Sequence, residues 1–362
     1  FFLDARGTTA RKDIYLQSHK PVLEQDEAVG HAVRAGYMYS GMADVAAITG
    51  DSSYVRAIDR IWENIVGKKI YITGGIGARH EGEAFGDNYE LPNLTAYNET
   101  CAAIGNVYTN YRLFLLHGDA KYFDVLERTL YNGLISGVSL DGGRFFYPNP
   151  LACDGKYRFN ADHTITRQPW FGCACCPSNI SRFIPSLPGY VYAVKDDKVY
   201  VNLFLSNRAK LKVNGKNVVL EQETSYPWNG DIRLTVAKGN QPFVMNVRIP
   251  GWVRGSVLPG GLYSYADGEE LAYRVSVNGQ EVKGALQKGY LSIDRRWKKG
   301  DVVEIHFDMQ PRVVKANDKV AADRGRVAIE CGPLVYCAEW PDNDFDISTL
   351  LLNRHPKFQV CL

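Results

Sequence analysis

The stretch EQDEAVGHAVRAGYMYSGMADVAAIT, residues 24–49, decides the fold of the first half of the chain. Its small and apolar residues recur at the i, i+3, i+4, i+7 spacing that marks the buried face of a helix. A break follows at Gly50-Asp51, where the Asp51 side chain is placed to cap the N-terminus of a second helix. The stretch therefore predicts a helical hairpin, and the residues expected on the buried face of its first helix are Val29, Ala32, Val33, Gly36, Tyr37 and Ser40.

The same arrangement recurs further along the chain. A helix predicted over residues 96–117 meets Gly118-Asp119, and a partner helix follows. Both junctions read Gly-Asp-x-x-Tyr, the weak internal repeat expected of stacked helical hairpins. With a last helix predicted over 177–190, we interpret the set as part of an α/α toroid. So few hairpins cannot close a ring without exposing apolar faces, and we expect the N-terminal part of the toroid to precede Phe1.

From residue 194 the apolar period changes to two, the period of strands. Two pairs of predicted strands are joined at Asn214-Gly215 and Asn278-Gly279, dipeptides that favour tight hairpin turns. The predicted strands lie at 199–205, 209–213, 216–222, 231–236, 243–249, 273–277, 280–282 and 301–307. The predicted fold class is therefore α + β multidomain: the C-terminal part of an α/α barrel over 1–193, a β-sandwich over 194–312, and an incomplete further β region over 313–362.

The composition of the 362-residue chain excludes some classes of protein. Lys and Arg number 42 against 40 Asp and Glu, and a net charge of +2 offers no electrostatic footprint for nucleic acid or an anionic membrane. No run approaches the roughly 18 apolar residues that span a bilayer. The first residues, FFLDARGTTARKD, lack an initiator Met and the regions of a signal peptide, so we expect a trimmed start. The compartment stays open between cytoplasm and periplasm.

Four of the eight cysteines fall in two tight clusters. Glu99 and Cys101 lie near the start of the third predicted helix, and CACCP, residues 173–177, lies just before the last one. Thiolates and a carboxylate are good zinc ligands, and one Glu with three Cys would give a tetrahedral site. The C-x-x-C pair of Cys173 and Cys176 also suits a redox dithiol or a disulfide, so metal, redox and inert interpretations stay open. The isolated cysteines expected to be small buried hydrophobes are Cys153, Cys331, Cys337 and Cys361.

The acidic residue with the most suggestive surroundings is Glu83, in the segment GEAF beside Phe85. An apolar neighbour raises the pKa of a carboxyl group by desolvation, which suits a general acid. Three more acids crowd the same loop, so the residues alone do not choose among them: Glu81, Asp87 and Glu90. By default, His31 is a core or surface histidine and Glu127 a solvated residue on a helix face.

Three stretches together carry a resemblance to a known family. These are ITGGIGARHEGEAFGDNYELPNLTAYNETCAAIGN (72–106), FFYPNPL (145–151) and FGCACCPSNISRF (171–183), and GHAVRAGYMYSGMADVA (30–46) adds to them. They resemble glycoside hydrolase family 127, the zinc-dependent cysteine glycosidases typified by β-L-arabinofuranosidase. That family combines an (α/α)6 barrel with appended β-sandwiches, which agrees with the fold predicted above.

The resemblance implies a reaction and a set of site residues. Cys175 would be the nucleophile and Glu83 the acid/base of a retaining hydrolase. The enzyme would release β-L-arabinofuranose, or a related pectic sugar, from plant-type glycans. The ligands of one Zn²⁺ would be Glu99, Cys101, Cys175 and Cys176. The residues that would line or support the sugar pocket are His31, Glu127 and Tyr147.

Two other classes of protein remain compatible with these residues. A noncatalytic carbohydrate-binding protein would carry a closed, structural zinc site, whereas a catalytic one keeps an open position. A thiol-disulfide protein would need an oxidisable pair, Cys173 and Cys176, and no metal. An oligosaccharide is the expected partner in the first two cases, and the oligomeric state stays open, with a homodimer among the alternatives.

Overall fold

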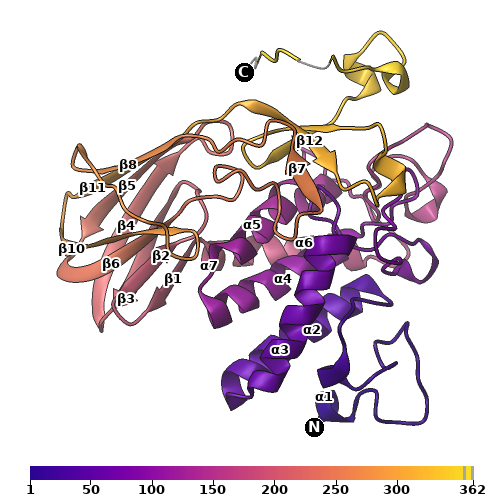
Figure 1. Cartoon of the computed structure of the whole chain (residues 1–362), viewed down its shortest axis with the longest axis horizontal. Coiled ribbons are helices and arrows are strands. Elements are labelled where there is room, and N and C mark those ends of the chain that lie inside the picture. The colour runs from indigo at the N-terminus through magenta and orange to yellow at the C-terminus, as the bar shows by residue number, and fades with distance from the viewer. Residues whose placement is uncertain (354–355, 360–362) are drawn as a thin grey trace.

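The computed structural model describes residues 1–353 and 356–359. Helices occupy the first half of the chain and strands the second, which gives a mixed α + β multidomain fold (Figure 1). In that view most of the strands lie to one side of the helical region, β7 and β12 lie above the helices, and the C-terminal segment projects above both regions. The α-helices are α1 (Phe2–Ala5), α2 (Ala32–Thr49), α3 (Ser52–Asn64), α4 (Thr100–His117), α5 (Ala120–Arg128), α6 (Cys175–Phe183) and α7 (Pro188–Val191).

The two predicted helical hairpins are present, and their junctions share one design. Gly50 ends α2 and Gly118 ends α4, both with a left-handed backbone that suits glycine. The next residue caps the following helix: Asp51 accepts a hydrogen bond from the backbone N–H of Ser53, and Asp119 does the same from Lys121. The Gly-Asp repeat in the sequence is therefore a pair of helix stop and start signals.

Helices α2 and α4 lie side by side and run parallel. Gly36 meets the backbone of Gly105, so close that a Cβ at Gly36 would lie 3.1 Å from the Gly105 carbonyl carbon. One turn later the hydroxyls of Ser40 and Thr109 are 3.2 Å apart. The same register offset at both contacts aligns the N-terminus of α2 with that of α4. The segments that precede the two helices therefore meet at one end of the helical region.

The buried face of α2 is wider than its sequence predicts. Ala35, Met38 and Tyr39 are buried together with most of the predicted residues, because α2 packs against both α3 and α4, whereas Val33 is only partly buried. The prediction that Tyr37 is buried is wrong, since 36% of its surface is exposed and its ring contacts Arg182 instead.

The last helix, predicted over 177–190, begins and ends at other residues in the structure. Helix α6 begins at Cys175, two residues before the predicted start, which places Cys175 and Cys176 in its first turn. It gives way to a 3-10 turn and then α7, because Pro185 and Pro188 lack the backbone N–H that a continuous helix requires.

The strands form three sheets. The orders are β1-β2-β6-β10, β3-β4-β5-β11-β8-β9 and β14-β13-β12-β7. Both Asn-Gly hairpins are confirmed: they join β3 to β4 and β8 to β9, with positive φ at all four turn residues. The strands are β1 (Tyr192–Lys195), β2 (Lys198–Val201), β3 (Asn207–Val213), β4 (Lys216–Thr224), β5 (Asp231–Lys238), β6 (Asn240–Arg248), β7 (Tyr263–Tyr265), β8 (Tyr273–Val277), β9 (Gln280–Glu281), β10 (Tyr290–Lys298), β11 (Val302–Phe307), β12 (Pro311–Ala316), β13 (Ala328–Cys331) and β14 (Leu334–Tyr336).

Six of the described strands lie outside the ranges predicted as strands: β1, β7, β10, β12, β13 and β14, of which the last three lie wholly or mostly in the β region predicted over 313–362. In β10 the charged run Asp294, Arg295 and Arg296 masks the apolar alternation, although the strand pairs with β6 along its whole length. β7 has only three residues and pairs with β12, so the third sheet takes one strand from a segment that lies between β6 and β8 in sequence.

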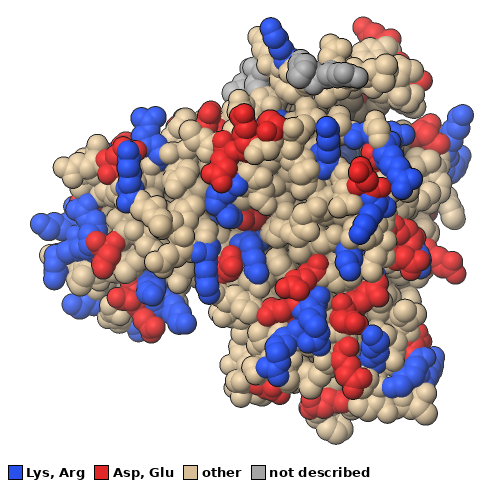
Figure 2. All heavy atoms as spheres, viewed as in Figure 1, with Lys and Arg blue, Asp and Glu red and all other residues tan. Residues whose placement is uncertain are grey.

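Two further observations concern the apolar character of the helices and the charge of the surface. In the described part of the chain, no helix combines the length and apolar character needed to span a bilayer. On the face seen in Figure 2, basic and acidic side chains are intermixed over both the helical and the strand regions.

Candidate active site and metal centre

A cluster of one carboxylate and three thiols forms where α4 and α6 begin. Glu99 and Cys101 flank the first residue of α4, and Cys175 and Cys176 lie in the first turn of α6. The Cys175 Sγ is 3.6 Å from Cys101 Sγ and 3.8 Å from Cys176 Sγ. The Glu99 Oε1 lies 3.4 Å from Cys175 Sγ and 3.5 Å from Cys176 Sγ. One ligand atom from each residue falls within 4.8 Å of all the others, so the group could hold a metal ion.

The cluster is buried, and its charges lack a protein partner. Glu99 is only 2% exposed and its Oε2 has no hydrogen-bond partner. Burial raises the pKa of Glu99 well above its usual range and also raises that of Cys176. Hydrogen bonds from Cys101 and Cys176 lower the pKa of Cys175 to about 2. Protein groups alone thus favour one thiolate, and a buried orphan carboxylate oxygen beside three sulfurs fits a cation of the kind that thiolates bind.

Tyr147 lies against the cluster. Its hydroxyl is 2.8 Å from Cys175 Sγ. The Tyr147 backbone is fixed on both sides: its N–H donates to Asn160 Oδ1 at 2.8 Å, and its carbonyl accepts from the N–H of Thr100 at 3.0 Å. The ring of Phe171 meets the Tyr147 ring edge-on at 5.6 Å. The loop that carries FFYPNPL is therefore attached to the first residue of α4, beside the thiols.

The Glu83 carboxylate accepts hydrogen bonds from two side chains of neighbouring segments. His31 Nε2 is 2.9 Å from Glu83 Oε2, and the Tyr97 hydroxyl donates to Glu83 Oε1 at 2.9 Å. These hydrogen bonds, with that from His31 the stronger, lower the pKa of Glu83 although partial burial opposes them. The expectation that Phe85 raises this pKa is wrong, because the Phe85 side chain is buried in the core and hydrogen bonding dominates.

The competing acids of the loop have other partners. Glu90 accepts a hydrogen bond from Arg79 Nε at 2.8 Å, and Asp87 lies 3.0 Å from the same guanidinium group. Glu81 precedes Gly82 on the exposed side of the turn. Of the acids in this loop, Glu83 is the one that faces the residues ahead of α2 and α4.

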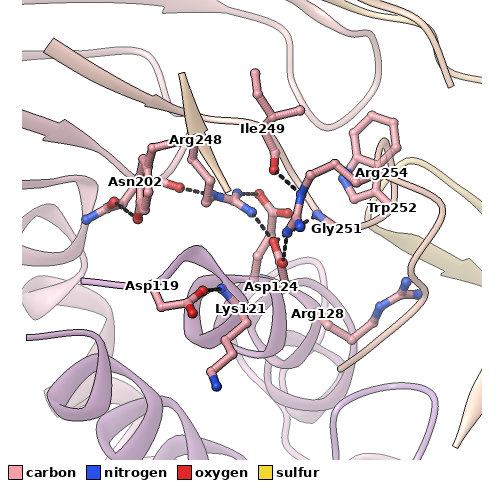
Figure 3. A network of polar contacts seen from close by, with 12 residues as sticks. Asp119, Lys121, Asp124, Arg128, Asn202, Arg248, Ile249, Gly251, Trp252 and Arg254 are labelled. Atoms are coloured by element: carbon pink, nitrogen blue, oxygen red, sulfur yellow. Dashed lines mark hydrogen bonds and ion pairs between the residues drawn. The ribbon is translucent and has the colours of Figure 1, made fainter. Parts of the chain in front are cut away.

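Glu127 is not in this region. It is 1% exposed, and its Oε1 accepts from Tyr226 at 2.9 Å and from Arg248 at 2.5 Å. Arg248, from β6, also donates to Asp124 at 2.9 Å, and Arg254 donates to the other oxygen of Asp124 at 2.7 Å (Figure 3). The network joins α5 to the strands, so the structure gives Glu127 an interdomain contact rather than a place with the other predicted pocket residues.

The remaining cysteines lie apart from the cluster. Cys173 is exposed, and no described cysteine forms a disulfide. Cys331 is buried as expected, whereas Cys153 and Cys337 are exposed, and the expectation of burial is wrong for both because they lie in surface loops. Cys361 lies outside the described residues.

Tyr97 is the residue that the sequence analysis missed. A lone tyrosine in a loop carries no chemical signal of its own. The one available signal is its position in TAYNETC, two residues before Glu99, in a segment already expected to form part of a site.

Fold and site together define a multidomain protein with a helical region that carries a candidate thiol-rich metal centre. Family models match along the whole chain. Residues 1–189 match the catalytic domain of the GH127 β-L-arabinofuranosidases, 198–309 their middle domain, and 311–362 the C-terminal domain of glycoside hydrolase family 127. The chain belongs to glycoside hydrolase family 127.

Individual relatives agree with this assignment. The chain is 39% identical over 349 residues to the non-reducing end β-L-arabinofuranosidase of Bifidobacterium longum subsp. longum, covering 93% of this chain and 50% of that protein. It superposes on a solved GH127 β-arabinofuranosidase with a TM-score of 0.96 at 76% identity, covering 99% of this chain and 56% of that one. Ara127N, a GH127 β-L-arabinofuranosidase from Geobacillus stearothermophilus T6, gives 0.88 at 40% identity, with 98% and 57% covered. The chain spans about half the length of these relatives.

Proposed function

We propose that the chain carries the reacting groups of a retaining β-L-arabinofuranosidase, with Cys175 as nucleophile and Glu83 as acid/base. The observation that carries this is the pattern of exposure. Glu99, Cys101 and Cys176 are buried, whereas Cys175 is half-buried and the Glu83 side chain is 32% exposed. The two groups with reactive roles are thus the accessible ones. A purely structural metal site would shield all of its ligands, so this pattern favours a catalytic centre over a noncatalytic binding protein.

We infer that the metal is zinc. With Zn–S bonds of about 2.3 Å and a Zn–O bond of about 2.0 Å, a tetrahedral site has S–S edges near ~3.8 Å and S–O edges near ~3.5 Å. Four of the six distances between ligand atoms, 3.6 and 3.8 Å for two sulfur pairs and 3.4 and 3.5 Å for two sulfur–oxygen pairs, fit those edges. Zinc, when bound, would supply the positive charge that keeps the buried thiols and the Glu99 carboxylate ionised.

The two residues would act in the two halves of a double displacement. The Cys175 sulfur attacks the anomeric carbon while Glu83 gives its proton to the departing glycosidic oxygen, and a thioglycosyl bond forms as the C–O bond breaks. Glu83, now a carboxylate, then takes a proton from water as the water oxygen attacks the anomeric carbon and the C–S bond breaks. Tyr147 would orient the sulfur through its hydroxyl.

The finer features of fold and substrate follow the same proposal. The parallel pair α2 and α4, each followed by an antiparallel partner, is the arrangement of inner and outer helices in an α/α toroid, and we infer that these helices belong to an (α/α)6 ring. The N-termini of inner helices then gather the site residues at one mouth of the ring. The substrate would be a glycan that presents a terminal β-L-arabinofuranoside.

The test pairs zinc content with hydrolysis. Native mass spectrometry of the purified chain should find one zinc per chain. Cys175→Ser should lower kcat on an aryl β-L-arabinofuranoside by at least about 10³-fold, because a serine hydroxyl is not ionised at neutral pH. Glu83→Gln should lose activity most with poor leaving groups. Cys173→Ser, a control at an exposed neighbouring cysteine, should leave both unchanged. Near-normal hydrolysis by Cys175→Ser would refute the nucleophile, and loss of activity in Cys173→Ser would favour the dithiol alternative.

A further inference from the structure

We propose that Tyr97 and His31 are positioning residues for the acid/base: together they hold the Glu83 carboxyl group in one orientation beside the Cys175 thiol. The inference rests on the roles proposed above for Glu83 and Cys175. Each donor takes a different oxygen of the carboxylate, Tyr97 the Oε1 and His31 the Oε2, both at 2.9 Å. A carboxyl group held at both oxygens cannot rotate, so the proton that it gives and takes stays at a fixed place.

Tyr97 is itself held on all sides. It is 6% exposed, and its ring meets His80 edge-on at 5.0 Å. Its backbone N–H donates to Ala78 at 3.4 Å, and its carbonyl accepts from the N–H of Asn149 at 3.0 Å. The only polar atom of its side chain therefore points at Glu83 from a fixed base. This is the arrangement expected of a residue that acts through another side chain.

The neighbours of His31 determine which of its two ring nitrogens carries the proton. It caps the N-terminus of α2, where its Nδ1 accepts from the backbone N–H of Arg34 at 3.4 Å. A nitrogen that accepts carries no proton, so the neutral ring keeps its proton on Nε2, the atom that faces Glu83. The histidine is thus a hydrogen-bond donor to the carboxylate in either charge state.

The backbone of the acid loop is built to present Glu83 in this one place. Gly82 and Glu83 both have positive φ, 70° and 51°, and for Glu83, which has a side chain, this left-handed backbone conformation is strained. It is stabilised by the following residue, since Ala84 exchanges two 3.0 Å backbone hydrogen bonds with Arg79. Phe85 then donates its N–H to Gly30 at 2.9 Å, next to His31. The strained turn therefore brings Glu83 to the N-terminus of α2.

Each of the two reacting groups has a tyrosine hydroxyl within hydrogen-bond distance, and the two tyrosines are neighbours. Tyr97 donates to Glu83, Tyr147 lies 2.8 Å from the Cys175 sulfur, and the centroids of the two rings are 6.3 Å apart. A change at Tyr97 should therefore affect the acid/base and leave the nucleophile in place. The titratable groups around Glu83 come from several segments: they are His31, Tyr97, Glu99 and Cys175. The Tyr15 ring lies beside the neighbouring Gly82.

The test removes a single hydroxyl. Tyr97→Phe keeps the ring that packs on His80 and deletes only the bond to Glu83. Because hydrogen bonds to charged groups are among the stronger ones, kcat on an alkyl or glycosyl β-L-arabinofuranoside should fall about 10- to 100-fold. An aryl substrate with a good leaving group should be affected less than about threefold, because its departure needs little protonation. KM should be unchanged on both.

The pH profile separates positioning from a merely structural role. The alkaline limb of kcat/KM reports loss of the protonated acid in the free enzyme. The Tyr97 hydroxyl favours the ionised carboxylate, so its removal raises the pKa of Glu83 and moves that limb to higher pH. His31→Ala should move it in the same direction, and His31→Gln, which keeps an N–H donor at similar reach, should restore part of the shift.

A matched control is Tyr263→Phe. Tyr263 is also 6% exposed, and its hydroxyl donates to the carbonyl of Ile70 at 3.0 Å, so the change removes a similar buried hydrogen bond without touching Glu83. It should leave the pH profile and the substrate dependence unchanged. If Tyr97→Phe also leaves them unchanged while Glu83→Gln is inactive on poor leaving groups, the positioning role is wrong and the proposed function stands. If Glu83→Gln keeps full activity, the proposed function itself is wrong.

Discussion

Two buried glutamates on neighbouring helices have opposite surroundings. Glu127 on α5 is 1% exposed and Glu99 ahead of α4 is 2% exposed. Around Glu127 two arginines, Arg248 and Arg254, balance two carboxylates, and a tyrosine hydroxyl completes the hydrogen bonds. Around Glu99 there are three thiols and one carboxylate oxygen without a partner. In the described part of the chain, no Lys, Arg or His lies within ion-pair distance of Glu99.

The difference distinguishes a structural charge cluster from a candidate metal site. A buried carboxylate is costly unless a cation compensates it. At Glu127 the protein supplies that cation from β6, which joins the helical region to the strands. At Glu99 the protein supplies only further acids, so the carboxyl group stays protonated unless a cation from outside the chain compensates its charge. Charge balance within the buried cluster, rather than burial alone, therefore identifies the site.

The largest expected effect breaks the balanced cluster. Arg248→Met should destabilise the chain by about 3–5 kcal/mol, because it leaves Asp124 and Glu127 as uncompensated buried charges. Urea unfolding followed by circular dichroism measures this. Arg233→Met is the control: its pair with Glu304 spans 2.8 Å but both side chains are about half exposed, so the loss should stay below about 1 kcal/mol. A loss of bound zinc from folded Arg248→Met would contradict the separation of the two clusters.

A smaller effect should follow at the unbalanced cluster. Glu99→Gln keeps the shape of the side chain but removes its charge, so zinc affinity should fall at least about tenfold, measured by competition with a chromophoric chelator. The stability of the metal-free chain should stay the same or rise slightly, since no protein cation loses its partner. A metal-free Glu99→Gln chain destabilised as much as Arg248→Met would mean that Glu99 is structural.

The sequence predicts local features of this molecule better than it predicts contacts between side chains that are far apart in the sequence. The Gly-Asp junctions and the Asn-Gly turns act within a few residues, and the structure has all four. The Glu-Cys and CACCP motifs indicate the cluster of possible metal ligands, because three thiols and a carboxylate are a ligand set that suits a metal ion. Glu127 could not be separated from a solvated glutamate, since Arg248 lies 121 residues away in sequence. Tyr97 was missed for the same reason, because its role depends on Glu83, which another segment brings to it.

The smallest effect concerns charges at the surface, where water solvates a charged side chain even without a counter-charge from the protein. Arg79 pairs with Glu90 and Asp87 in the loop that carries Glu83, and the hydrogen bond from Arg79 lowers the pKa of Glu90. A carboxyl group whose pKa is lowered on folding stabilises the fold above its unfolded pKa, near ~4.3, and loses that contribution as the pH falls through the folded pKa. Because Glu90 is about one-third exposed, Glu90→Gln should cost at most about 0.5–1 kcal/mol at pH 7 and nothing at pH values well below the folded pKa. Unfolding free energies of the two chains measured across this range should converge on acidification, and a difference that persists at low pH would mean that packing, not charge, accounts for the loss.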